Sequence, residues 1–108
     1  MAKLEKTLNG SFDGWLDKIV DGILNSSMSA TLEDGSDFCS GDARCSVRVF
    51  ERYSYSGSNR VSMNVTLFQS GKGPIYMSAV TAGGSQAVLF KFNTLGEEAF
   101  LDKLKEIM

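Results

Sequence analysis

Residues 44–68 constrain the fold most, because apolar and polar residues alternate on both sides of a turn rich in Ser, Gly and Asn. A period of two is typical of strands with one buried face. On both strands the residues predicted to face the core have odd numbers. Two antiparallel strands can share a face in this way only if the loop between them has an odd number of residues or a β-bulge intervenes. We therefore expect a five-residue loop over residues 56–60, or a bulge. The residues predicted to face the core are Cys45, Val47, Val49, Tyr53, Val61, Met63, Val65 and Leu67.

Three elements are predicted before this pair. Residues 3–8 alternate weakly and indicate a short edge strand. Apolar residues then recur at helical spacing over residues 12–24, and the hydroxyl of Ser11 can cap the first turn. A second strand is expected over residues 28–33. The acidic, glycine-containing segment 33–42 is predicted to be a loop.

Three further elements are predicted after the pair. Residues 75–81 alternate with odd positions inward, so the connection through residues 71–74 should contain an odd number of loop residues or a bulge. A two-residue type II′ turn at Gly84 and Ser85 is expected to lead into a strand over residues 86–92. A capping box over residues 94–97 then predicts the start of a C-terminal helix.

These elements predict one α+β domain over residues 1–108, in the order β-α-β-β-β-β-β-α. Each strand has one apolar face, so we expect a curved antiparallel sheet with two amphipathic helices packed on one face. A helix-grip-like variant, with the sheet wrapped around the C-terminal helix, would leave an apolar cavity between that helix and the sheet.

The amino-acid composition narrows the functional classes. The chain has no histidine and only two cysteines, so a zinc site would need carboxylates, and we expect no metal and no cofactor. Without histidine, no Ser-His or Cys-His pair can activate a nucleophile, so we do not expect an enzyme. The acidic residues between positions 33 and 42 do not match a calcium-binding loop.

Charge and hydropathy bear on location. The formal net charge of -2 gives no overall attraction to nucleic acid or to an anionic membrane. No apolar run approaches the roughly 18 residues that a membrane span needs. The first six residues lack the apolar stretch of a signal peptide. We therefore expect a cytoplasmic protein without a membrane partner, in which Cys39 and Cys45 stay reduced.

The polar face of the central strand pair is the first candidate site. Arginine beside exposed aromatic side chains is typical of protein interfaces and also of surfaces that stack on bases. The net negative charge of the chain argues against nucleic acid as a partner. We therefore expect self-association as a homodimer, or binding of another protein. A solvated sheet face is the alternative. The candidate residues are Arg44, Arg48, Phe50, Arg52, Phe68 and Tyr76.

Two other functional hypotheses remain open. Met63, Met77, Phe90, Phe92 and Phe100 could line the helix-grip-like cavity of an apolar-ligand carrier, although the same side chains fill ordinary cores. A thiol enzyme or redox sensor at Cys39 is the third hypothesis, because a nearby cation such as Arg44 favours the thiolate.

Several segments also carry a family resemblance. They are LEDGSD (32–37), RCSVRV (44–49), ERYSY (51–55), GGSQA (83–87) and GEE (96–98). Together they resemble a family of short, uncharacterised bacterial proteins, catalogued as a domain of unknown function and found mainly in anaerobic Gram-positive bacteria. The resemblance implies a bacterial cytoplasmic protein, and it implies no activity, ligand or catalytic residue.

Overall fold

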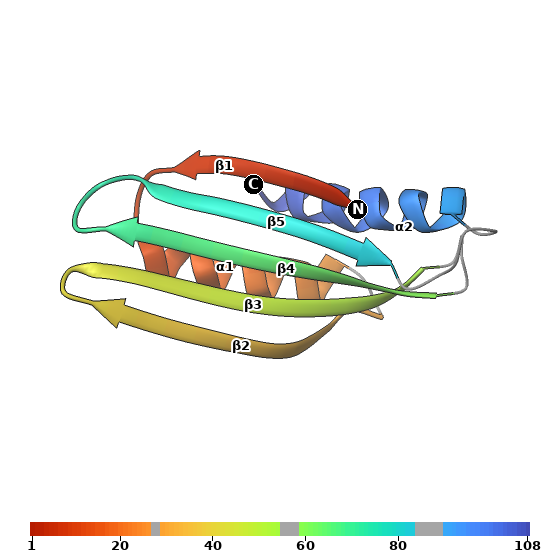
Figure 1. Ribbon diagram of the computed structural model, residues 1–108, viewed down its shortest axis with the longest axis horizontal. Coiled ribbons are helices and arrows are strands. Elements are labelled where there is room, and N and C mark those ends of the chain that lie inside the picture. Colours follow the sequence, from red (N-terminus) through yellow and green to blue (C-terminus); the bar gives the residue numbers. More distant parts are fainter. Residues whose placement is uncertain (27–28, 55–58, 84–89) are drawn as a thin grey trace.

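The computed structural model of the chain describes residues 1–26, 29–54, 59–83 and 90–108. Five strands form one antiparallel sheet with two helices on one side of it, so the predicted α+β class is confirmed (Figure 1). The elements are β1 (Ala2–Leu8), α1 (Phe12–Ser26), β2 (Thr31–Ser40), β3 (Ala43–Ser54), β4 (Asn59–Ser70), β5 (Ile75–Gly83) and α2 (Phe90–Ile107). The strand order is β1-β5-β4-β3-β2, which places β4 in the middle.

Helix α1 and strand β1 form where the sequence predicts them. The Oγ of Ser11 accepts a hydrogen bond from the backbone N–H of Gly14 at 3.1 Å, which satisfies one free donor of the first helical turn. Asp13 adds a negative charge at the positive end of the helix. The apolar stripe faces the sheet, and its buried members are Phe12, Leu16, Ile19 and Ile23.

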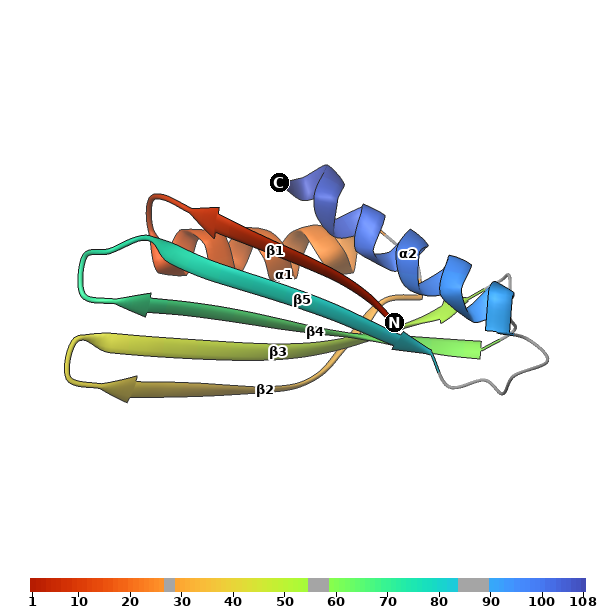
Figure 2. The ribbon, with the colours of Figure 1, turned by 45° about the horizontal axis from the view of Figure 1, so that its top comes forward.

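The hydrophobic core lies between the two helices and one face of the sheet (Figure 2). Fully burying one large apolar side chain stabilises the fold by about 1.5–3 kcal/mol. Contacts between this sheet face and the helices are therefore a main source of stability. Strands β4 and β5 contribute Val61, Met63, Val65, Leu67, Ile75, Met77 and Ala79. Helix α2 contributes Phe100, Leu101 and Leu104.

The predicted parity of β4 and β5 is confirmed. Gln69 pairs with Ile75, and an odd number of residues (70–74) lies between them. Odd-numbered residues of both strands therefore share the helix-bearing face.

The predicted parity of β3 is wrong. Ser54 pairs with Asn59, so an even number of residues (55–58) separates the two strands, and there is no five-residue loop over residues 56–60. Odd residues of β3 consequently lie opposite even residues of β4, and it is the even side of β3 that faces the helices. Phe50, on that side, is completely buried. Cys45, Val47, Val49 and Tyr53 lie on the opposite face.

The segment predicted to be a loop over residues 33–42 is mostly strand. Strand β2 begins at Thr31, and its last residue, Ser40, pairs with Ala43 across a two-residue turn. Gly41 has a φ of 58°, a left-handed conformation that glycine adopts without steric cost. A register shift between Leu32 and Asp34 marks a β-bulge. The acidic, glycine-containing sequence of the segment is the reason that it is predicted to be a loop.

The C-terminal prediction is wrong at residues 90–92, where α2 has already begun and no strand exists. The capping box over residues 94–97 is wrong for the same reason, because it lies inside the helix. The predicted type II′ turn at Gly84 and Ser85 lies outside the described residues.

Neither helix in the described parts of the chain is long and apolar enough to cross a membrane.

Candidate protein interface

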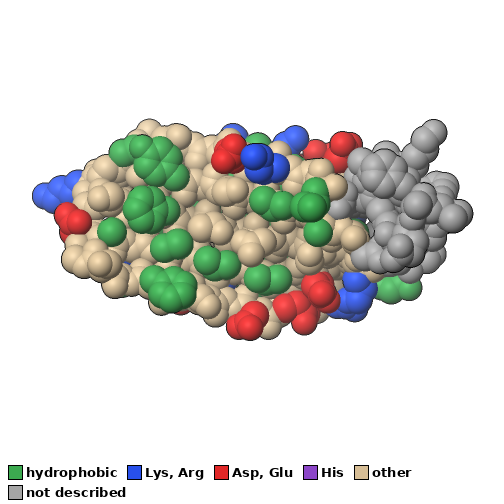
Figure 3. All heavy atoms as spheres, viewed as in Figure 1, with side chains coloured by type: hydrophobic (Ala, Val, Ile, Leu, Met, Phe, Trp, Pro, Cys, Tyr) green, Lys and Arg blue, Asp and Glu red, His purple; other side chains and the backbone are tan. Residues whose placement is uncertain are grey.

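The sheet face turned away from the helices is the candidate site, and we call it the outer sheet face. It faces the viewer in Figures 1 and 3. The pairings Val47 with Thr66 and Val49 with Asn64 place odd residues of β3 and even residues of β4 on it. The pairing of Asn64 with Val80 extends it onto β5. Within the described chain, no helix covers this face.

One row of side chains crosses four strands of the outer sheet face near its hairpin end. Phe38 pairs with Cys45, Cys45 with Phe68, and Phe68 with Tyr76. The three aromatic residues remain exposed, with 64% of Phe38, 40% of Phe68 and 53% of Tyr76 accessible. Hydrophobic side chains gather in a line across the strands at this end in Figure 3. We call Phe38, Cys45, Phe68 and Tyr76 the aromatic row.

A small apolar pocket of about 110 Å³ adjoins the aromatic row, between β2, β3 and β4. Phe38, Cys45 and Phe68 line it on the outer side. A shallow apolar pocket beside exposed aromatic rings offers a place for an anchoring side chain of a partner.

Charge is confined to the rim of the outer sheet face. In the described parts of the three central strands, its only charged residues are Glu51 and Arg60, which pair with each other at 2.8 Å near one end. Lys3 and Glu5 on β1, which form an ion pair at 3.6 Å, and Asp34 on β2 lie at the two edges of the sheet. The middle of this face is uncharged and mixes Val47 and Val49 with the polar Asn64 and Thr66. An uncharged centre with charges at the rim is usual for a protein interface.

The arginines predicted for this face lie on the other one. Arg44 donates from Nη2 to Oδ1 of Asp13 at 2.9 Å, and its guanidinium carbon lies 4.0 Å from the ring centroid of Phe12. The guanidinium carbon of Arg52 lies 5.4 Å from the ring centroid of Phe100. These two arginines therefore hold β3 against α1 and α2 instead of presenting charge on the outer sheet face.

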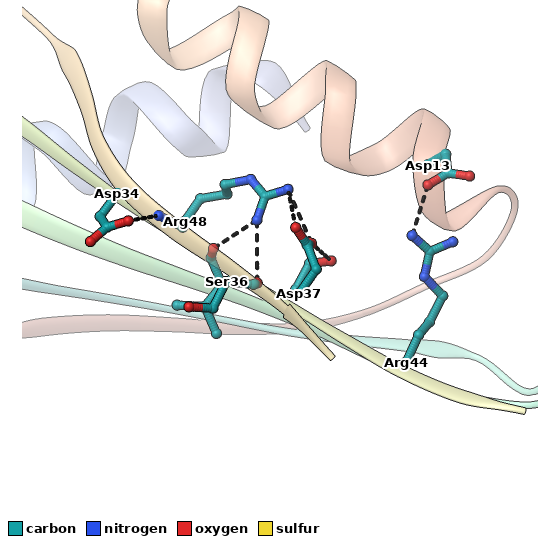
Figure 4. Close-up of polar contacts among 9 residues, drawn as sticks. Asp13, Asp34, Ser36, Asp37, Arg44 and Arg48 are labelled. Carbon is teal, nitrogen blue, oxygen red and sulfur yellow. Dashed lines mark hydrogen bonds and ion pairs between the residues drawn. The ribbon is translucent and has the colours of Figure 1, made fainter. Parts of the chain in front are cut away.

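Arg48 ties β3 to β2 (Figure 4). Its Nη2 donates to both carboxylate oxygens of Asp37, at 3.1 and 3.2 Å, and its Nη1 donates to the carbonyl of Val47 at 2.9 Å. The buried Ser46 hydroxyl donates to Oδ1 of Asp37 at 2.6 Å. The hydrogen bonds from Ser46 and then Arg48 hold the pKa of the Asp37 carboxyl below its usual value near 3.8.

The predicted face is thus divided by the register. Phe68 and Tyr76 lie on the outer sheet face, whereas Arg44, Arg48 and Arg52 lie on the helix-bearing face. Phe50 is part of the core with no exposed surface. The expectation that all six candidates share one surface is therefore wrong.

The residues of the predicted cavity are core residues where the structure describes them. Met63 and Phe100 have no exposed surface, and Met77 is 2% exposed. The side chains of Phe90 and Phe92 lie outside the described part. A surface pocket of about 410 Å³ does occur between the start of β1 and α2, and none of the five predicted residues lines it.

The two thiols point to opposite faces. Cys39 pairs with Arg44 on the helix-bearing side, and Cys45 lies on the outer sheet face. Both are free thiols; Cys39 is exposed and Cys45 is half-buried. The Arg44 guanidinium is already bound to Asp13. Within the described residues, no group of three or more Cys, Asp or Glu side chains gathers in a way that could hold a metal ion.

Sequence reasoning missed Phe38, Cys45, Val47 and Val49 as surface residues. A signal for them exists in the dipeptide at positions 41 and 42, because glycine followed by aspartate between alternating stretches is typical of a two-residue hairpin turn. That turn gives residues 31–40 and 43–54 opposite parity, which brings Phe38 beside Cys45.

Comparison with known proteins gives a family and no activity. Neither the curated proteins nor the solved structures include a match to the chain. A family of unknown function, DUF6054, matches residues 1–108. The chain therefore belongs to the DUF6054 family.

Proposed function

We propose that the protein is a non-enzymatic interaction module that self-associates through the outer sheet face. The observation that carries the proposal is the aromatic row, in which three exposed rings, with Cys45 between Phe38 and Phe68, form one line across four neighbouring strands. Scattered exposed apolar residues are normal on monomers, whereas a contiguous patch with a charged rim is typical of a binding surface.

The sheet edges are less suited to association than the face. The free edge of β1 carries Lys3, Glu5 and Lys6. The free edge of β2 carries a β-bulge next to Asp34, followed by Asp37. Charges and bulges at edge strands oppose the addition of a further strand. Association through the face is therefore favoured over association through the edges.

A second copy is the occupant that we favour, for reasons of size and charge. The two larger extents of the molecule, 47 and 25 Å, limit the area of the outer sheet face to about 1,200 Å². This area leaves room for the roughly 800 Å² per partner that a stable interface buries. The net charge of -2 adds only weak repulsion between copies. Aromatic rings are the side chains that most often anchor such contacts.

The proposal extends to a bacterial cytoplasmic protein. The five segments that resemble uncharacterised bacterial proteins support the origin. The two free thiols, one of them exposed on β2, suit a reducing compartment.

The test is Phe68→Glu, with Leu32→Glu as its matched control. Phe68 and Leu32 are 40% and 42% exposed, but Leu32 pairs with Phe50 and so lies on the helix-bearing side. Native mass spectrometry and light scattering after gel filtration should find a wild-type dimer, a monomeric F68E and a dimeric L32E. A wild type that stays monomeric at tens of micromolar would refute self-association.

A further inference from the structure

We infer that the second copy packs with a twofold axis over β4, nearly parallel to that strand, so that β1 of each protomer lies over β2 of its partner. This inference rests on the proposed self-association through the outer sheet face. With the strand order β1-β5-β4-β3-β2, such an axis exchanges β1 with β2 and β5 with β3. It therefore overlaps the two faces along their full width.

The aromatic row is self-complementary under this operation. Phe68, on the central strand, comes close to its own copy. Tyr76 on β5 comes over the partner's Cys45, because β5 and β3 exchange. A large ring thus meets a small side chain, beside the pocket of about 110 Å³ that Phe38, Cys45 and Phe68 line. Interdigitation of large and small side chains is how packed sheets fill their interface.

The edge charges favour the same axis. On the outer sheet face, β2 presents Asp34 and no basic residue. Strand β1 presents Lys3 there, with its Nζ 3.6 Å from Oε1 of Glu5 on the same strand. An axis in the interface plane but perpendicular to the strands would lay β2 over β2 and oppose acidic edges. The axis along β4 instead brings Asp34 of one copy to Lys3 of the other, which pairs opposite charges.

Lys3 and Asp34 specify the contact further. They are the ends of a single cross-strand row, in which Lys3 pairs with Val80, Val80 with Asn64, Asn64 with Val49, and Val49 with Asp34. Four strand spacings separate them within one protomer, about 19 Å. The twofold axis places Lys3 of each copy across from the partner's Asp34, so the dimer contains this pair twice.

Arg60 is the one like-charged contact to consider, since it also lies on β4. Face-packed sheets cross at about 30°, which places the axis about 15° from the strand. If the crossing point is at Thr66, Arg60 lies about 20 Å along β4, and the two Arg60 residues are offset sideways by about 10 Å. Each is also neutralised by its own Glu51 at 2.8 Å.

Charge exchange between the edges tests the arrangement. Lys3→Glu and Asp34→Lys, made separately, should each weaken the dimer roughly tenfold at low salt, because two ion pairs become two repulsions. An equimolar mixture of K3E and D34K should restore a dimer of wild-type affinity, because both pairs are then attractive again. Rescue cannot arise within one chain, given the separation of the two residues.

Two controls apply the same charge changes away from the outer sheet face. Lys6 pairs with Met77 and lies on the helix-bearing side of β1, and Asp17 is exposed on α1. K6E and D17K should leave the dissociation constant within about twofold of wild type, as expected for remote, screened charges. Sedimentation equilibrium across protein concentration gives all these constants.

The outcomes separate the two proposals. A monomeric wild type overturns both the self-association and this arrangement. A wild-type dimer that K3E and D34K do not weaken, or that their mixture does not restore, overturns the arrangement and leaves self-association through the outer sheet face in place.

Discussion

Replacing Phe50 tests the register of β3, on which the outer sheet face depends. Phe50 has no exposed surface and belongs to the core that holds α1 and α2. Phe50→Ala removes most of a buried ring and leaves a cavity, at a cost of about 3–5 kcal/mol in the free energy of unfolding. The neighbouring Val49 is on the opposite face and only half-buried. Val49→Ala should therefore cost about 1 kcal/mol or less.

Urea unfolding followed by the fluorescence of Trp15, the single tryptophan, measures both free energies. With typical urea m-values of about 1–3 kcal/mol/M, F50A should lower the midpoint by roughly 2 M. Measurements at two protein concentrations, tenfold apart, remove the contribution of self-association from the comparison. Phe50→Leu, which keeps more of the volume, provides a folded variant if F50A does not fold.

The register would be refuted by a larger loss for V49A than for F50A. That result would put the odd residues of β3 in the core, and the aromatic row would not exist. A loss for F50A well below 1 kcal/mol would have the same meaning.

Two further predictions concern single groups. Asp37→Asn should lower the urea midpoint at pH 7, because the folded-state pKa of Asp37 lies below its unfolded value near 3.8 and its charged form is the stabilising one. The midpoint difference from wild type should shrink as pH falls through the folded-state pKa, and a difference that persists in acid would contradict the role of the charge. Alkylation of Cys45, followed by peptide mass spectrometry, should slow as protein concentration rises through dimer formation, while that of Cys39 should not. Equal behaviour of the two thiols would place the interface elsewhere.

The parts of the fold that sequence reasoning predicted are those where one face has more aliphatic residues than the other. Helix α1 has a single stripe and a serine cap, and the larger aliphatic residues of β4 and β5 are mostly at odd positions, although Phe68, Tyr76 and Val80 are at even ones. Strand β3 differs, because it has apolar side chains on both faces. Val47 and Val49 lie on one face and Phe50 lies on the other. Periodicity cannot choose between two apolar faces, so the turn length decides the register.

The candidate site was predicted in part for the same reason. Phe68 and Tyr76 were placed on an exposed face because β4 and β5 were oriented correctly. Phe38 is missed because the polar sequence of β2 resembles a loop. Pairing to β3 and the contacts of Arg48 hold this segment as a strand. Such tertiary support has no local signature in the sequence.

The pairing of β1 with β5 has a consequence for how the chain folds during synthesis. Strand β1 is made first, yet its partner, residues 75–83, emerges last among the strands. The apolar stripe of α1 likewise waits for β4, β5 and α2 before it can be covered. Contacts between residues so distant in sequence form slowly and leave apolar surface open in the meantime. The chain is therefore expected to complete its fold only after β5 and α2 have emerged from the ribosome, which makes the nascent chain a candidate for chaperone binding.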